Sequence, residues 1–176
     1  MIKNLFIAIL VLFANILQAQ VLFFDHGKME FYTATVLSDI EAVTDKMEVK
    51  LDVQTRNIEI KVYINSFEFE YETMKEHFNE KYMESDKFPQ ATFKGAIVQD
   101  ISNIKDEIEV DGTGELTIHG ISRKIEVKAN ISKMNEYTVI KSKIPIIFKD
   151  YGVDDPSILT KSVAKDILIE SIFYLK

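Results

Sequence analysis

The sequence predicts one all-β domain, an antiparallel barrel of about eight strands with one or two short helices. Apolar and polar residues alternate with period two in successive runs from Met29 onward. The chain reverses locally near Gly120, between two such runs. No Pro/Gly/Ser-rich linker divides the 176 residues, of which 47% are hydrophobic. A chain of this size and composition can form one domain with a substantial core.

The first clear strands cover residues 47–53 and 58–64, where apolar side chains occupy every second position and charged ones fill the positions between. The alternation continues at Phe67, Phe69 and Tyr71 after a slip of one residue. Such a slip is typical of a β-bulge. Each of these strands therefore has one apolar face and one solvated face.

Residues 74–83 interrupt the strands with helical spacing. Met74, Phe78 and Tyr82 fall at i, i+4 and i+8 among charged residues, which predicts an amphipathic helix. We expect it to be either a lid over one mouth of the barrel or a plug that closes it. A second short helical turn is expected around residues 155–159, with Pro156 at its first position.

The second half of the chain begins with a turn at Pro89, which keeps Phe88 extended before a strand that contains Phe93. A β-hairpin follows over residues 114–131, and the chain reverses around Gly120, Ile121 and Ser122. These strands are therefore antiparallel neighbours.

Alternation alone allows the apolar faces to point into the barrel or outward into a membrane. Three features favour the inward arrangement: the helix interrupts the strand series, Trp is absent, and the chain ends in Tyr174, Leu175 and Lys176 rather than on an aromatic residue.

Three segments resemble the YceI family of bacterial lipid-binding proteins: SDKFPQATFKG at 85–95, GELTIHGISRKIEVKANI at 114–131, and the closing stretch 148–175. Near the N-terminus the sequence departs from the family pattern, because Gly27 follows His26 and Thr35 stands where a second histidine is expected. The resemblance implies an antiparallel, eight-stranded, lipocalin-like β-barrel with an apolar interior. It also implies a ligand, a long polyisoprenoid of the quinone type or the prenyl-phosphate type, held inside the barrel.

We expect such a lipid chain to contact apolar side chains on the inner faces of the strands, with Phe78 as a cap. Each is equally explained as an ordinary core residue, because every barrel needs an apolar interior. The candidates are Phe67, Phe69, Phe78, Phe93, Ile118, Val127 and Ile146.

A lipid head group would lie at a mouth, among polar residues. The candidates are Lys87, His119, Arg123 and Lys124. Arg123 and Lys124 stand next to the hairpin turn, where they can meet a phosphate or quinone oxygen. The competing interpretation is that these cations are solvated or paired with acids such as Glu126.

The sequence favours binding over catalysis. It contains no cysteine, no nucleophile elbow and no phosphate-binding loop, and its three histidines lie in unrelated segments, so we expect no metal site and no cofactor other than the lipid itself. Asp154 and Asp155 are more typical of a helix cap than of a calcium site. Two alternatives remain: an envelope interaction module with a filled barrel, and an enzyme that acts on a lipid head group through His119.

Residues 1–19 are typical of a secretory signal peptide, with Lys3, an apolar run and Ala19 before the cleavage site, which leaves 20–176 as the mature domain. An N-terminal membrane anchor is the alternative, but the apolar run is shorter than the roughly 20 residues of a spanning helix. We expect a periplasmic or secreted protein. The net charge of −7 makes nucleic acid an improbable partner. A homodimer through an exposed edge or helix stays open.

Overall fold

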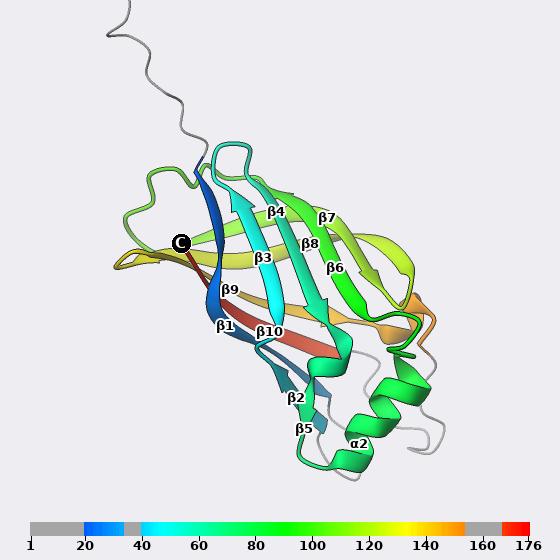
Figure 1. The fold of residues 1–176 in the computed structure, drawn as a ribbon. Coiled ribbons are helices and arrows are strands. Elements are labelled where there is room, and N and C mark those ends of the chain that lie inside the picture. The colour runs from blue at the N-terminus through cyan, green and yellow to red at the C-terminus, as the bar shows by residue number, and fades with distance from the viewer. Residues whose placement is uncertain (1–19, 34–39, 154–166) are drawn as a thin grey trace, which may run out of the picture.

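In the residues that the structure, a computed structural model, describes (20–33, 40–153 and 167–176), ten strands form, and eight of them close into an antiparallel barrel (Figure 1). The strands are β1 (Val21–Thr33), β2 (Ile40–Thr44), β3 (Met47–Asp52), β4 (Asn57–Tyr63), β5 (Glu68–Phe69), β6 (Gln90–Ile97), β7 (Ile108–Ile118), β8 (Ile121–Met134), β9 (Tyr137–Ile146) and β10 (Ile167–Leu175).

The ring runs in the order β1-β3-β4-β6-β7-β8-β9-β10, and β10 pairs again with β1. β2 and β5 lie beside the ring, because β2 pairs with residues 29–33 of β1 and β5 pairs with β2. The predicted antiparallel, eight-stranded barrel is confirmed.

The barrel has two unlike ends. We call the end where β1 begins and β10 finishes the terminal end, and the end that carries helix α2 (Glu72–His77) the helix end (Figure 1). The turn between β7 and β8 and the 3₁₀ helix η3 (Phe148–Tyr151) lie at the helix end, because each strand reverses the direction of the one before it.

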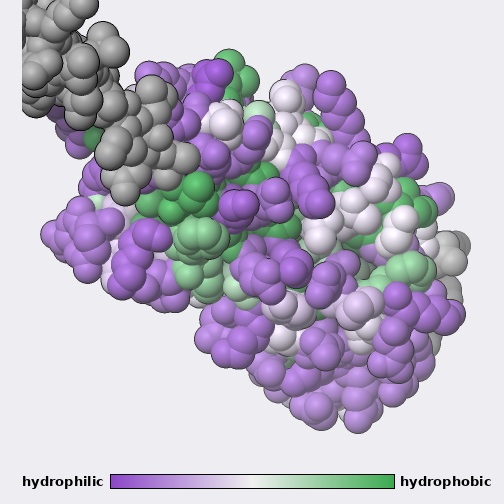
Figure 2. Space-filling model, turned by 45° about the horizontal axis from the view of Figure 1, so that its top comes forward, coloured by the Kyte–Doolittle hydropathy of each residue, from purple (hydrophilic) through white to green (hydrophobic). Residues whose placement is uncertain are grey.

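Apolar side chains face the interior, as the alternation predicts. In β3, Met47, Val49 and Leu51 are buried, whereas Glu48 and Lys50 are exposed. Each such burial stabilises the fold by about 1.5–3 kcal/mol. On the face shown in Figure 2, hydrophilic side chains predominate, with smaller hydrophobic patches between them.

Helix α2 closes the helix end. It continues into a single π-helical turn, η2 (Phe78–Tyr82), so the helix predicted over residues 74–83 is confirmed and begins two residues earlier. Phe78 is buried, and its ring centroid lies 5.3 Å from that of Phe31 and 5.8 Å from that of Phe67. The helix thus acts as a plug in this structure. None of the helices in the described residues is long and apolar enough to cross a membrane.

One local prediction was wrong, and the turn of the predicted hairpin, which is otherwise confirmed, lies slightly earlier than expected. The slip in alternation after β4 comes from a 3₁₀ helix, η1 (Ile64–Ser66), and not from a β-bulge. The hairpin reverses at His119 and Gly120, because Ile118 pairs with Ile121. Both turn residues have positive φ, 49° and 75°, as a type I′ turn requires. The turn predicted around residues 155–159 lies outside the described residues.

Candidate functional site

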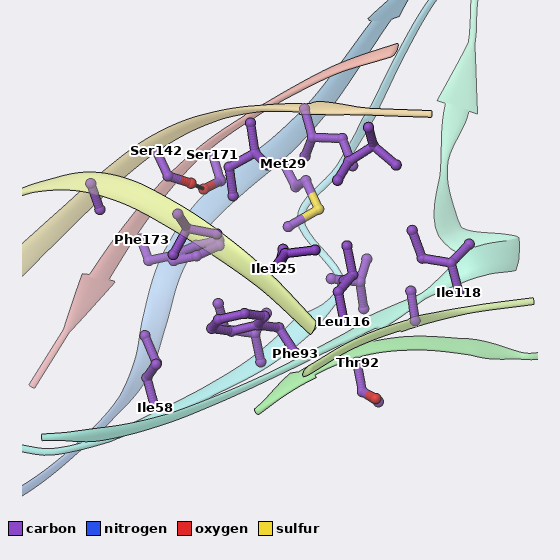
Figure 3. Close-up of a pocket in the computed structure, with 18 of the residues that line it drawn as sticks. Met29, Ile58, Thr92, Phe93, Leu116, Ile118, Ile125, Ser142, Ser171 and Phe173 are labelled. Carbon is purple, nitrogen blue, oxygen red and sulfur yellow. Dashed lines mark hydrogen bonds between the residues drawn. The ribbon is translucent and has the colours of Figure 1, made fainter. Parts of the chain in front are cut away.

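An apolar cavity of about 140 Å³ lies inside the barrel (Figure 3). Its lining comes from seven of the eight ring strands, all except β3, and from residues outside these strands. The latter are Ile64, Phe67, Phe78, Met83 and Phe148. Among the described residues that line it, the polar side chains are those of Thr92, Ser142 and Ser171. The cavity is therefore suited to a hydrocarbon rather than to a polar metabolite.

Phe93 forms part of the cavity wall without filling it. A Cβ atom at Gly114 would lie 2.6 Å from the Phe93 ring, and one at Gly95 would lie 2.7 Å from it. These two glycines are cross-strand partners in β6 and β7. Since neither has a side chain, the ring lies flat against the wall beneath it.

Both ends of the barrel are closed by buried apolar side chains. At the helix end, Phe31, Phe67 and Phe78 pack together. At the terminal end, the buried side chains of Leu22, Leu51, Ile101 and Leu175 lie beyond the cavity and do not line it.

The barrel wall is open on one side. β8 pairs with β9 from Met134 and Tyr137 as far as Ala129 and Ser142, and the ladder stops there. Beyond this point the two strands do not pair with each other and diverge toward the helix end (Figure 1). We call the opening between residues 121–128 of β8 and 143–146 of β9 the lateral gap. Pro145 lies in the part of β9 that pairs with β10, opposite Leu168, but not with β8, which is the edge position where a proline is tolerated.

The cavity reaches the lateral gap. Ile125 and Val127 on the β8 edge and Ile144 and Ile146 on the β9 edge all line the cavity. The gap therefore connects the apolar interior with the side of the barrel.

Two hydroxyl groups meet inside the cavity at the closed corner of the gap. The Oγ atoms of Ser142 and Ser171 are 2.7 Å apart and form a hydrogen bond between β9 and β10 (Figure 3). Each hydroxyl thus satisfies the other, so this polar pair can be buried without a large desolvation cost.

Comparison with protein families decides what kind of barrel this is. The model of the YceI-like domain matches residues 18–172. The chain belongs to the YceI-like family. The match extends toward the N-terminus beyond the three segments that resemble the family, and it includes the stretch around His26 and Gly27.

Solved structures show the same fold. A polyisoprenoid-binding domain from Saccharophagus degradans is 11% identical with a TM-score of 0.77, covering 90% of this chain and 99% of that one. Burkholderia cenocepacia BcnA is 20% identical with a TM-score of 0.71, covering 84% and 95%. The Campylobacter jejuni YceI protein is 18% identical with a TM-score of 0.52, covering 92% and 88%. No curated protein matches the sequence. At these identities the likeness concerns the fold alone.

The YceI-like barrel brings most of the predicted chain-contacting residues to one cavity. These are Phe67, Phe78, Phe93, Ile118, Val127 and Ile146. Phe69 lies outside the lining and packs behind it, with its ring centroid 5.6 Å from that of Phe31 and 5.1 Å from that of Phe78.

The four predicted head-group residues do not converge. Lys87 and His119 both contact the carboxylate of Glu84, and His119 also packs against the Phe88 ring. Hydrogen bonds from Lys87 and then His119 hold the pKa of Glu84 below its usual range. This carboxylate therefore engages two of the four candidates, Lys87 and His119, at the helix end.

Arg123 and Lys124 lie on the β8 edge of the lateral gap. The Arg123 Nε atom donates a hydrogen bond to the backbone oxygen of Asp150 at 3.1 Å, which connects β8 with η3. Lys124 is exposed opposite Glu115 in the ladder. Of the four candidates, these two are the ones next to the opening.

Sequence reasoning missed several residues of the YceI-like cavity. Phe173, Ser171 and Ile169 follow period two in β10, so the alternation of the last strand held a signal for them. Phe31 had a weaker signal, because a shift of register between Phe24 and His26 breaks the alternation of β1. Ser142 and Ser171 are polar residues at inward-facing positions of β9 and β10. A polar residue on the apolar face of an alternating strand can be recognised from the sequence alone.

Proposed function

We propose that this YceI-like protein is a non-catalytic periplasmic or secreted carrier that holds the chain of a long isoprenoid or similar lipid inside its barrel. The observation that carries the proposal is the apolar cavity, which is closed at both ends and reaches the lateral gap. The similar Saccharophagus degradans domain, described as polyisoprenoid-binding, supports the same class of ligand.

The driving force is the removal of hydrocarbon from water. Each buried CH₂ group contributes roughly 0.8 kcal/mol, so a chain of several isoprene units can bind without a polar contact. A lining with only three polar side chains among its described residues matches such a ligand.

The size of the cavity limits what it can hold without rearrangement. Its volume of about 140 Å³ is close to the roughly 150 Å³ of an engineered apolar cavity that binds benzene. It therefore accepts about one ring-sized segment as it stands. A longer chain requires side chains such as Phe78 to move, or the lateral gap to widen.

Two other functions have less support. An interaction module with a filled barrel is disfavoured by the cavity itself. An enzyme that uses His119 is disfavoured because this residue does not line the cavity.

The test is a titration of the protein, purified from cells that express the full chain, with prenyl alcohols of increasing length. We expect affinity to rise from geraniol to farnesol to geranylgeraniol, by up to about 0.8 kcal/mol for each additional buried CH₂ group. Native mass spectrometry of the same preparation should detect a co-purified lipid. A protein that carries no lipid and binds none of the three alcohols would overturn the proposal.

A further inference from the structure

The lateral gap has an excess of positive charge in a chain whose net charge is −7. Residues 121–128 and 143–151 form the two edges of the gap and the turn that closes it. They contain five cations, Arg123, Lys124, Lys128, Lys143 and Lys149, and two carboxylates, Glu126 and Asp150. The local charge is therefore opposite in sign to that of the whole molecule.

Protection of the strand edges explains part of this excess. Charged side chains, lysines above all, keep an unpaired strand from pairing with other molecules. Lys128 forms ion pairs with Glu109 and Asp111, and Lys143 forms one with Glu170. These lysines point to the outside of the barrel and already have partners.

Arg123 differs because it lies on the inner face of β8. Its cross-strand partner is Leu116, which lines the cavity, and the next inward residue along β8 is the cavity residue Ile125. Arg123 is exposed, so its side chain lies where the apolar lining ends and solvent begins. Arg123 is therefore neither packed in the core nor part of the charged outer surface.

One hydrogen bond orients the guanidinium group of Arg123, and only one of its three nitrogens has a hydrogen-bond partner among the described residues. Its Nε atom donates to the backbone oxygen of Asp150 at 3.1 Å. Among the described residues, no carboxylate lies within ion-pair distance of the two terminal nitrogens, and no hydrogen bond engages them. A guanidinium held through Nε presents its remaining donors to a planar or tetrahedral anion.

We propose that Arg123 binds the phosphate head group of a lipid whose chain occupies the cavity. This inference rests on the proposed function and adds the chemistry of the head group. Because both ends of the barrel are closed, the head group leaves through the lateral gap, and among the described residues Arg123 is the cation on its inner edge.

The experiment compares three probes with the same purified protein: farnesol, farnesyl phosphate and inorganic phosphate. The variants are Arg123→Gln, Arg123→Lys and, as the matched control, Lys124→Gln. The control removes the same charge from the adjacent residue, which lies on the outer face of the same strand. Circular dichroism checks that each variant is folded.

We expect the wild-type protein to bind farnesyl phosphate roughly tenfold more tightly than farnesol, and Arg123→Gln to lose this advantage while it keeps its affinity for farnesol. Lys124→Gln should keep the advantage, and Arg123→Lys should keep part of it. If Arg123→Gln does not fold, Arg123→Lys decides, because a lysine ammonium cannot bind the phosphate through two planar N–H donors and should lose part of the advantage, whereas Lys124→Gln should lose none.

Equal affinity of the wild-type protein for farnesol and farnesyl phosphate would overturn the inference and leave the proposed function intact. An equal loss in Lys124→Gln would also overturn it, since a general positive field would then be sufficient. Inorganic phosphate that binds as tightly as farnesyl phosphate would overturn it as well, because the phosphate would then bind without help from a chain in the cavity. Failure of both farnesyl compounds to bind, in a protein that also carries no lipid and binds neither geraniol nor geranylgeraniol, would instead reject the proposed function itself.

Discussion

Phe93 is a large side chain that leaves the cavity open because two glycines lie beneath its ring. Gly95 and Gly114 face each other across β6 and β7, and a Cβ atom on either would meet the ring at less than 3 Å. The ring is thus part of the wall over which a lipid chain would lie.

Replacement of Phe93 with Glu tests this role. A carboxylate in the apolar wall must be desolvated when a hydrocarbon covers it, so we expect Phe93→Glu to weaken farnesol binding at least about tenfold. The matched control is Phe23→Glu, because Phe23 is 57% exposed on the outside of β1 and should affect binding little. Isothermal titration measures both. Unchanged binding in a folded Phe93→Glu protein would remove Phe93 from the site.

The hairpin of β7 and β8 depends on a two-residue turn in which both residues have positive φ. His119 has φ 49° and Gly120 has φ 75°. A Cβ atom on Gly120 would also lie 2.7 Å from the Phe88 ring. The turn therefore fixes the register of the two strands that lead to the lateral gap.

We expect Gly120→Ala to lower the free energy of unfolding by about 1–2 kcal/mol, because an L residue with a side chain is strained at this φ. His119→Asn should cost less, since Asn tolerates positive φ and Asn-Gly is a preferred type I′ pair, although the contact with Glu84 is lost. Urea unfolding compares the two variants. A larger loss in His119→Asn would show that the contact with Glu84 matters more than the turn geometry.

The fold and most of the candidate cavity could be predicted from the sequence because period-two alternation assigns each residue to a face. The same reasoning could not separate the 3₁₀ helix η1 from a bulge, since both shift the phase of alternation by one residue. It also could not find the lateral gap, because the point where β8 and β9 separate depends on how the sheet curves. Pro145 was the local sign of the lateral gap in the sequence. The role proposed for Arg123 stays a prediction.

The charge distribution of the whole molecule makes its stability sensitive to acid. A hydrogen bond from Lys61 lowers the pKa of Glu48, and backbone N–H groups, first that of Thr55, lower the pKa of Asp52. Other described carboxyls with a lowered pKa are Asp25, Glu84, Asp100, Glu107 and Asp111. Because folding favours their charged forms, their contribution is present above the ordinary pKa values of 3.8 and 4.5 and is lost as the pH falls through the lowered ones.

We therefore expect the unfolding temperature to be nearly constant around neutral pH and to fall as the pH drops below about 4.5, the ordinary value for Glu. The raised pKa values of lysines such as Lys61 and Lys128 act in the opposite sense, and their contribution is lost only as the pH rises beyond the ordinary 10.5. Calorimetry over this range checks the prediction. An unfolding temperature that rises on acidification would contradict it.

The ladder between β8 and β9 stops at Ala129 and Ser142, so the circumference of the barrel can change along the lateral gap. A fully paired ring can widen only by breaking backbone hydrogen bonds, whereas residues 121–128 and 143–146 can move apart without breaking any between these two strands. The barrel is therefore stiff where neighbouring strands are paired and deforms most easily along the lateral gap. Lipid chains of different thickness then require nearly the same free energy to deform the backbone. Selectivity among lipids therefore depends on the head group at the lateral gap and not on the enclosed chain.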